Sequence, residues 1–241
     1  MTGPRVIGHR GAAGHAPENT LASFRKAAAL GARWVEFDTK LSRDGHVVVF
    51  HDEELDRTTN GSGRLADKDL AELKMLDAGG WFSESFRGER IPTLDETMAV
   101  LGELGMGANV EIKPCPGREI ETAEAVVRTL KAGWPATVPG PVISSFKPAS
   151  MAVATRLAPA YPGALLVGEI PVDWRRRLDD LGCTGLHCDA EHLTREQAGE
   201  VLDAGYALRC YTIKEAAVAR RLFAWGVEAV FTAYPDRISV E

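Results

Sequence analysis

The chain has 241 residues, of which 45% are hydrophobic and 26% are charged, and its formal net charge is −6. This composition is that of a globular protein, and the length allows one domain with a sizeable core. The acidic balance disfavours a general binder of nucleic acid or of anionic membranes, so an anionic ligand would need a local positive site.

Strand-like and helix-like segments alternate along the chain. Strands are predicted at 5–9, 34–39, 46–50, 109–113, 141–146, 163–168, 185–188, 207–212 and 229–232, and helices at 18–30, 94–105, 119–133, 148–157, 174–181, 195–204 and 215–225. Helix-start signals are Pro17 before ENTLASF, Thr93 before LDET and Thr194 before REQA. The alternation is typical of a parallel sheet with right-handed crossovers. Eight such strands in a chain close to the roughly 250 residues of a TIM (β/α)8 barrel predict that fold.

The strand at 46–50 does not fit the parallel order. Only SRDGH separates it from the preceding strand, and a parallel crossover needs a dozen or more residues. We therefore expect an antiparallel hairpin after the second barrel strand, followed by an irregular segment. We interpret residues 1–241 as one domain, with an insertion at about 46–90 that caps part of one rim.

Three carboxylates lie within predicted strands. Glu36 and Asp38 are two residues apart in WVEFDTKL, and Glu111 in NVEIKP precedes Lys113 by two residues. Side chains two apart share one face of a strand, and unpaired carboxylates inside a barrel are costly unless they hold a cation. Oxygen ligands favour Mg²⁺ or Ca²⁺ over zinc. Taken alone, Glu36 and Asp38 fit the polar face of an edge strand equally well.

Two histidines follow strand-like runs and would lie near these carboxylates. His9 ends the first strand, before RGAAGHAPENT, and the return strand of the hairpin carries His51 of VVVFHD back toward the carboxylates. Two histidines with three carboxylates are the parts of a metal-assisted hydrolase. Arg10 and Lys113 could supply positive charge for an anionic substrate, although a structural ion pair is the simpler interpretation of Arg10 alone.

The order of these motifs resembles the glycerophosphodiester phosphodiesterase family. HRGAAGHAPENT looks like its opening signature, EFDTKLSRDGHVVVFHD like its second and NVEIKP like its third. RTTNGSG, DAGGWFSESFRGE, IPTLDE, SSF and GVEAVFT also fall in family order. The likeness runs essentially from end to end, and several motifs at the right intervals are far more specific than HRG alone. The chain is most similar to the compact bacterial cytoplasmic members.

The resemblance implies a TIM barrel that hydrolyses glycerophosphodiesters to glycerol 3-phosphate and an alcohol, with one divalent cation. By position, the implied roles are metal ligands for Glu36, Asp38 and Glu111, acid and base for His9 and His51, and phosphate binding for Arg10 and Lys113. Either histidine could be the acid, and either water or the glycerol 2-hydroxyl could be the nucleophile. The alternatives are a related activity on lysophospholipids, of the lysophospholipase D type, and a phosphodiester-binding protein without catalysis.

Several nearby residues have less specific interpretations. Glu18 and Asn19 lie where the first helix is predicted to begin, so a helix-start role fits them as well as a role in the site, and Glu18 is kept as a candidate site residue. Asp52 could orient His51 or cap a turn. Tyr211 could form an aromatic wall in YTIK, where the family often has Asn in place of Lys214.

Other features are interpreted as structural. At the last strand the family often has Thr-Asp, whereas this chain has Thr232-Ala233, for which a local structural effect is expected. Trp81 and Phe82 are expected to pack within the insertion. We expect His46 to be an exposed hairpin residue, and His187 and His192 to be rim or loop residues. Four scattered cysteines indicate reduced core residues: Cys115, Cys183, Cys188 and Cys210.

No apolar segment of the sequence reaches the roughly 18 residues of a membrane helix, and the first residues show no signal core. We therefore expect a cytoplasmic protein without membrane insertion. The expected partner is a small glycerophosphodiester, and a homodimer is possible.

Overall fold

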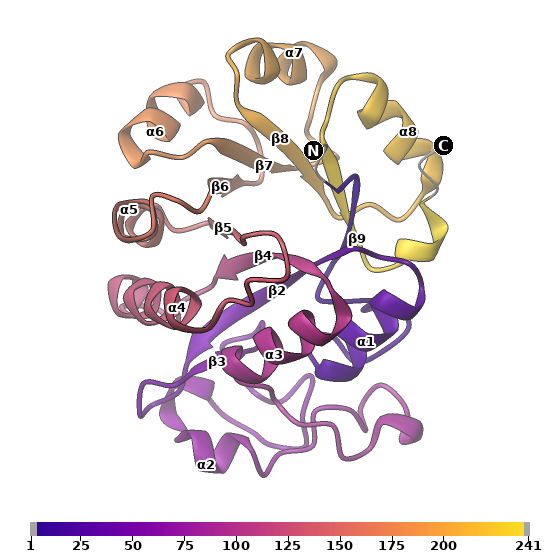
Figure 1. Cartoon of the computed structure of the whole chain (residues 1–241), viewed down its shortest axis with the longest axis vertical. Coiled ribbons are helices and arrows are strands. Elements are labelled where there is room, and N and C mark those ends of the chain that lie inside the picture. Colours follow the sequence, from indigo (N-terminus) through magenta and orange to yellow (C-terminus); the bar gives the residue numbers. More distant parts are fainter. Residues whose placement is uncertain (1–3, 239–241) are drawn as a thin grey trace.

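The structure is a computed structural model that describes residues 4–238. Its centre is a closed ring of eight parallel strands (Figure 1). They are β1 (Val6–Gly8), β2 (Trp34–Leu41), β4 (Gly107–Ile112), β5 (Val142–Ser145), β6 (Gly163–Val167), β7 (Gly185–Asp189), β8 (Ala207–Tyr211) and β9 (Ala229–Thr232). The ring closes where β1 pairs with β2, with Gly8 opposite Val35. The predicted TIM barrel is confirmed.

The extra strand β3 (Val47–Val49) lies outside the ring. It pairs antiparallel with the end of β2, with Thr39 opposite Val49 and Leu41 opposite Val47, so the predicted hairpin is confirmed. The chain then continues through the short helix α2 (Leu70–Leu73) and two 3₁₀ turns, in the lower part of Figure 1. A small cluster of buried apolar residues stabilises this segment: Val48, Phe50, Leu55, Leu65, Leu73, Ala78 and Ile91.

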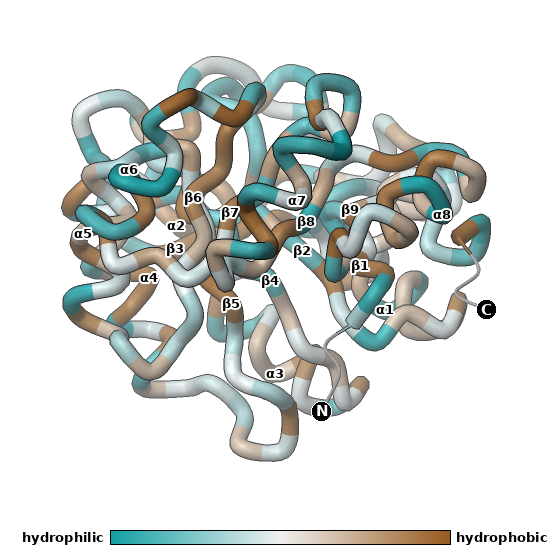
Figure 2. The backbone as a smooth tube through the Cα atoms, turned by 90° about the horizontal axis from the view of Figure 1, so that it is seen from above, coloured by the Kyte–Doolittle hydropathy of each residue, from teal (hydrophilic) through white to brown (hydrophobic). Residues whose placement is uncertain are grey.

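Among residues 4–238, seven longer helices surround the barrel. They are α1 (Leu21–Ala29), α3 (Leu94–Leu104), α4 (Glu119–Gly133), α5 (Pro148–Leu157), α6 (Trp174–Leu181), α7 (Arg195–Asp203) and α8 (Ala216–Ala224). Thr93 and Thr194 begin α3 and α7 with capping boxes, as their start signals predict. In Figure 2 hydrophobic and hydrophilic residues alternate along these helices, as expected for helices with one buried face. Within residues 4–238, no helix combines the length and apolar character needed to cross a bilayer.

The predicted start of the first helix is wrong. The helix begins at Leu21, and the Thr20 side chain caps it by accepting a hydrogen bond from the Ser23 backbone N–H. Asn19 has φ 57°, a left-handed conformation that helical residues do not adopt. Its side chain reaches β2 instead, where its Nδ2 donates to Asp38 at 2.9 Å. Residues 18 and 19 therefore belong to the loop between β1 and α1.

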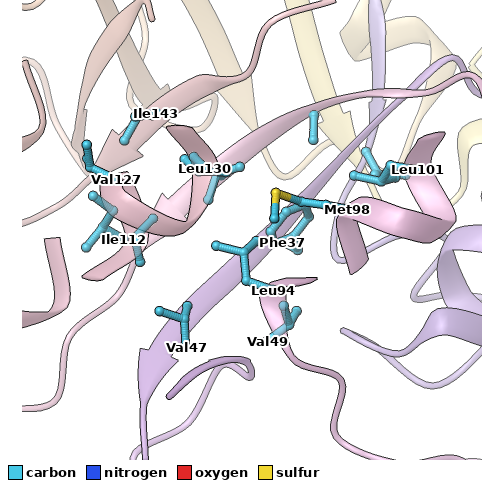
Figure 3. Packing of buried hydrophobic residues seen from close by; sticks show 14 of the residues in the cluster. Phe37, Val47, Val49, Leu94, Met98, Leu101, Ile112, Val127, Leu130 and Ile143 are labelled. Carbon is cyan, nitrogen blue, oxygen red and sulfur yellow. The ribbon is translucent and has the colours of Figure 1, made fainter. Parts of the chain in front are cut away.

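The main hydrophobic core lies between the barrel and its helices. Phe37 on β2 contacts Phe24 of α1, with ring centroids 5.6 Å apart. Figure 3 shows Phe37 beside Leu94 and Met98 of α3. Alternate strand residues face this layer, so the residues between them face the barrel interior. This alternation directs Glu36 and Asp38 inward from either side of Phe37.

The prediction that His187 is a rim or loop residue is wrong, because His187 lies inside the barrel. Its side chain is 1% exposed, and its ring centroid is 5.2 Å from that of Phe231. Its strand neighbours Leu186 and Cys188 face the helices, which turns His187 inward. His46 is exposed, and His192 lies in the turn between β7 and α7, each as predicted. The four cysteines are buried and free.

Candidate active site

The carboxyl ends of β1, β2 and β4 meet at one mouth of the barrel, where catalytic residues of this fold are found. A cavity of about 290 Å³ opens there. It is lined by His9, Arg10, Glu36, His51, Asn109, Glu111, Lys113, Phe146, Leu166, Tyr211, Thr212 and Phe231. The structure thus brings together eight of the nine candidate residues around this cavity or directly behind it, and the ninth, Glu18, contacts Arg10.

Three buried carboxylates form the floor of the site. Glu36 and Asp38 extend from β2, and Glu111 extends from the neighbouring β4, with Asp38 and Glu111 paired in register. One oxygen of each side chain lies within 4.8 Å of the others. The second oxygen of Glu36, Oε1, is buried without a hydrogen-bond partner among the described residues. The three carboxylates could therefore hold a cation.

The three carboxylates outnumber the two cationic side chains that contact them, Lys113 and Arg10. Lys113 Nζ lies 3.0 Å from Glu111 and 3.6 Å from Asp38, and Arg10 Nε lies 3.3 Å from Asp38. Burial, followed by repulsion from Asp38, raises the pKa of Glu36 well above its usual value and that of Glu111 to about 7. Burial alone would raise the pKa of Asp38, but Arg10 and Lys113 outweigh it and lower that pKa to about 2.

The loop after β1 is tightly fitted against β2. A Cβ atom on Gly8 would lie 2.3 Å from the Gly11 carbonyl oxygen, so only glycine allows this approach. Arg10 has φ 50°, a conformation that costs energy in a residue other than glycine. In this conformation its backbone N–H donates to Glu36 Oε2 at 2.9 Å while its guanidinium reaches Asp38. The strained turn therefore directs both the backbone and the side chain of Arg10 at the carboxylates.

The two candidate histidines lie at the mouth of the barrel on different segments. His9 follows β1, and its Nε2 is 3.8 Å from Glu36 Oε2. Burial, and then the charge of Arg10, lower the pKa of His9 to about 3. Burial also lowers the pKa of His51, although Asp38 opposes this shift. Both imidazoles are therefore neutral near pH 7 in the free protein.

Asp52 fixes the orientation of His51. Burial would raise the pKa of Asp52, but hydrogen bonds from Arg57 and His51 lower it to about 2. The ionised carboxylate can only accept, so His51 Nδ1 donates to Asp52 Oδ1, at 2.5 Å. This bond selects the tautomer in which Nε2 is the unprotonated nitrogen. Of the two interpretations of Asp52, orientation of His51 therefore agrees with the contacts.

Aromatic side chains form another wall. The rings of Phe146 and Tyr211 are 5.9 Å apart, and Lys113 Nζ lies 5.6 Å from the centroid of Phe146. The Tyr211 hydroxyl donates to the Val167 carbonyl at 2.7 Å, which holds its ring in place. Lys214, the departure near Tyr211, is exposed and lies beside an adjoining hollow.

A second, wider hollow adjoins the first across His51, Glu111, Lys113 and Phe146. Consecutive residues after β3 line one side of it: His51, Asp52, Glu53 and Glu54. Through these four residues, the segment after β3 lines part of the two cavities. Trp81 and Phe82 instead contact each other edge to face, with ring centroids 5.6 Å apart, and so pack within the insertion as predicted.

Sequence reasoning missed several residues of the site. Asn19 hydrogen-bonds Asp38, whereas its sequence position fits a helix-start role as well as a role in the site. Arg57, in RTTNGSG, donates to both Glu18 and Asp52, yet its place in an irregular segment gave no sign of its partners. Asn109 is two residues before Glu111 on the same face of β4, and the period of two could have identified it. Ala233 accepts a backbone hydrogen bond from Gly14, a local structural contact.

Comparison with known proteins agrees with this arrangement. The model of the glycerophosphoryl diester phosphodiesterase family matches residues 9–237. The chain is 35% identical to a glycerophosphodiester phosphodiesterase of Bacillus subtilis, with 96% of this chain and 84% of that protein covered. It is 36% identical to one of Caldanaerobacter subterraneus, with 97% and 95% covered.

Solved structures show the same relationship. A phosphodiesterase of Oleispira antarctica, in complex with the product sn-glycerol-3-phosphate, is 44% identical and superposes with a TM-score of 0.95, over 98% of this chain and 95% of that one. A glycerophosphodiester phosphodiesterase of Agrobacterium tumefaciens is 27% identical, with a TM-score of 0.78 over 97% and 98% of the two chains. The chain therefore belongs to the glycerophosphoryl diester phosphodiesterase family of phosphoric diester hydrolases, as the resemblance in its sequence predicts.

Proposed function

We propose that this protein hydrolyses glycerophosphodiesters to glycerol 3-phosphate and an alcohol, with a divalent cation and a pair of histidines. The observation that carries the proposal is the convergence of three buried carboxylates, two histidines and two cations on one cavity at the carboxyl ends of the barrel strands. The product named in the complex of the Oleispira antarctica relative supports the same substrate class.

The site fits a hard divalent cation. Glu36, Asp38 and Glu111 would hold it, because Arg10 and Lys113 are the only lysine or arginine side chains within 4 Å of these carboxylates among residues 4–238. When all three carboxylates are ionised, two positive charges leave one negative charge in excess. Two observations agree with this shortage of positive charge. Glu36 Oε1 has no hydrogen-bond partner among the described residues, and the pKa values of Glu36 and Glu111 are raised. All ligand atoms are oxygens, which favours Mg²⁺ or Ca²⁺. When bound, such a cation offsets the charge on a phosphate oxygen.

Arg10 and Lys113 would bind the remaining charge of the phosphodiester. Both side chains line the cavity and lie within 4 Å of the carboxylates. A phosphate at the cavity mouth would therefore meet the positive charges of Arg10 and Lys113 as well as the metal ion. Such groups stabilise the charge that develops in the transition state. The guanidinium of Arg10 offers the planar donor pair that suits phosphate oxygens.

His9 and His51 would transfer the protons. A neutral imidazole can accept a proton from the nucleophile, and the Asp52 carboxylate would stabilise the imidazolium that forms at His51. The other histidine would protonate the leaving oxygen, since the negative charge of the bound diester raises its pKa above that in the free protein. The two histidines enter the site from different segments and so can act on opposite sides of the phosphorus.

The two hollows suit the two halves of the substrate. The smaller one has apolar walls at Leu166, Tyr211 and Phe231 and would hold the invariant glycerol. The wider one would hold the alcohol, since it opens beyond His51 and Lys113. We propose that the chain forms one catalytic domain, with residues 46–90 as an insertion at the rim. A cytoplasmic location and a possible homodimer stay predictions.

The test is release of glycerol 3-phosphate from the choline, ethanolamine, glycerol and inositol glycerophosphodiesters. Protein stripped with EDTA is assayed alone and after addition of Mg²⁺ or Ca²⁺, with a lysophospholipid as a further substrate. Release that depends on the added cation supports the proposal and ranks the alcohols. Turnover of the lysophospholipid alone would replace it with the lipid activity, and folded protein without turnover would favour the binding-protein interpretation.

A further inference from the structure

Arg57 joins two segments that carry the candidate histidines. The loop after β1 carries His9, Arg10 and Glu18, whereas the segment after β3 carries His51 and Asp52. The Arg57 guanidinium lies between Glu18 and Asp52 and donates to both carboxylates. These two carboxylates in turn contact Arg10 and His51.

The bridge is geometrically complete on both sides. Toward Asp52, Arg57 Nε donates to Oδ2 at 2.5 Å and Nη2 donates to Oδ1 at 3.1 Å. Toward Glu18, Nη1 donates to Oε2 at 2.9 Å and Nη2 donates to Oε1 at 2.7 Å. Two forked contacts fix the planes of both carboxylates, which the single charge of a lysine cannot do.

Each carboxylate transmits this constraint to the site. Asp52 Oδ1 accepts from His51 Nδ1, so the plane of Asp52 determines the orientation and tautomer of the imidazole. Glu18 Oε1 accepts from Arg10 Nη1 at 2.7 Å, while Arg10 Nε lies 3.3 Å from Asp38. One guanidinium outside the cavity thereby links the loop of His9 and Arg10 to the side chain of His51.

We propose that Arg57 is a positioning residue, which holds His51 and the His9–Arg10 loop in the relative arrangement needed for proton transfer on both sides of the phosphate. The proposal rests on the proposed function of the site. Arg57 does not line either hollow, and its side chain is 46% exposed. Loss of the bridge should therefore lower kcat more than it raises KM, since small displacements of catalytic groups lower the rate strongly, while Lys113, which the bridge does not contact, still meets the phosphate.

Arg43 supplies a matched control. It lies after β2, is 56% exposed, and donates to Asp69 from Nε and Nη2 and to Glu72 from Nη2. Arg43→Gln thus removes a similar forked ion pair with two carboxylates, but one that does not contact a candidate site residue. The ion pairs of Arg43 are exposed and contribute little to stability, and in Arg57→Gln the carboxylates Glu18 and Asp52 keep their contacts with Arg10 and His51, so both glutamine variants should fold.

The experiment compares wild type, Arg57→Gln, Arg57→Lys and Arg43→Gln in kcat and KM for sn-glycero-3-phosphocholine with Mg²⁺, and for the best substrate of the panel. We expect Arg57→Gln to lower kcat about tenfold or more with KM changed less than about threefold. Arg57→Lys should retain an intermediate kcat, and Arg43→Gln should stay within about twofold of wild type. A kcat of Arg57→Gln within twofold of wild type, a change in KM alone, or an equal loss in Arg43→Gln would overturn the proposal.

A second readout does not need turnover. In protein labelled with ¹⁵N-histidine, the two ring nitrogens of His51 are assigned with His51→Ala and compared at pH 8. We expect the tautomer protonated at Nδ1 in wild type and Arg43→Gln, and a mixture of tautomers in Arg57→Gln. An unchanged His51 spectrum in Arg57→Gln overturns the proposal even if wild type does not hydrolyse the diester, whereas a changed spectrum without wild-type turnover supports the positioning and contradicts the proposed function instead.

Discussion

Cation binding at the three carboxylates should release protons near neutral pH. Burial and the charge of Asp38 raise the pKa of Glu111 to about 7 and also raise that of Glu36, whereas Asp38 is already ionised. At pH 7 about half of the Glu111 side chains therefore carry a proton, and Glu36 contributes up to one more. Since carboxylate ligands bind in the deprotonated form, about 0.5 to 1.5 protons should leave for each Mg²⁺ or Ca²⁺ bound.

Isothermal titration calorimetry measures this release directly. The apparent binding enthalpy is determined at pH 7 in buffers with different ionisation enthalpies, and its slope gives the number of protons. At pH 9 the Glu111 contribution should vanish, and affinity should increase from pH 6 to pH 8 because proton loss accompanies binding. Glu36→Gln should release fewer protons and bind more weakly. Equal heats in all buffers at pH 7 would refute the reasoning.

Three further predictions concern other parts of the molecule. His51→Ala should lower kcat by about 10²–10⁴ and leave cation affinity within about twofold, as measured by product release and calorimetry; near wild-type turnover with the cation bound would remove His51 from the mechanism. Burial lowers the pKa of His187, so its contribution to stability is complete above about pH 6.5 and falls below it by about 1.4 kcal/mol per unit. His187→Met should therefore show a shallower loss between pH 7 and pH 5.5 in urea unfolding, and an equal slope would contradict this. Phe37→Ala, which removes a fully buried ring, should cost about 3–5 kcal/mol in the same assay, and a loss below about 1 kcal/mol would contradict the packing.

The fold and the centre of the site could be predicted from the sequence because both follow from regular local patterns. Alternating strands and helices indicate the barrel, and a period of two places Glu36 and Asp38 on one face. The carboxyl ends of neighbouring parallel strands lie at the same mouth of the barrel, so Glu111 at the end of β4 lies close to Asp38 on β2. This proximity follows from the fold alone. The antiparallel β3 was predictable because the intervening segment is too short for a crossover.

The remaining features depend on tertiary contacts that no local pattern encodes. Asn19 lies outside α1, although ENT was predicted to begin the helix, because its side-chain amide forms hydrogen bonds with the side chain and the backbone N–H of Asp38. Arg57 finds partners 39 and 5 residues away in an irregular segment without periodicity. His187 lies inside the barrel although histidine is a polar residue, since only the strand register determines its direction.

The most direct test of the site is a crystal structure of the protein with Ca²⁺ and glycerol 3-phosphate. We predict the ion between Glu36, Asp38 and Glu111, the phosphate within reach of Arg10 and Lys113, and the glycerol in the smaller hollow. His9 and His51 should face the phosphate from different sides. An ion or a phosphate bound elsewhere, with these three carboxylates free of metal at saturating Ca²⁺, would contradict the account.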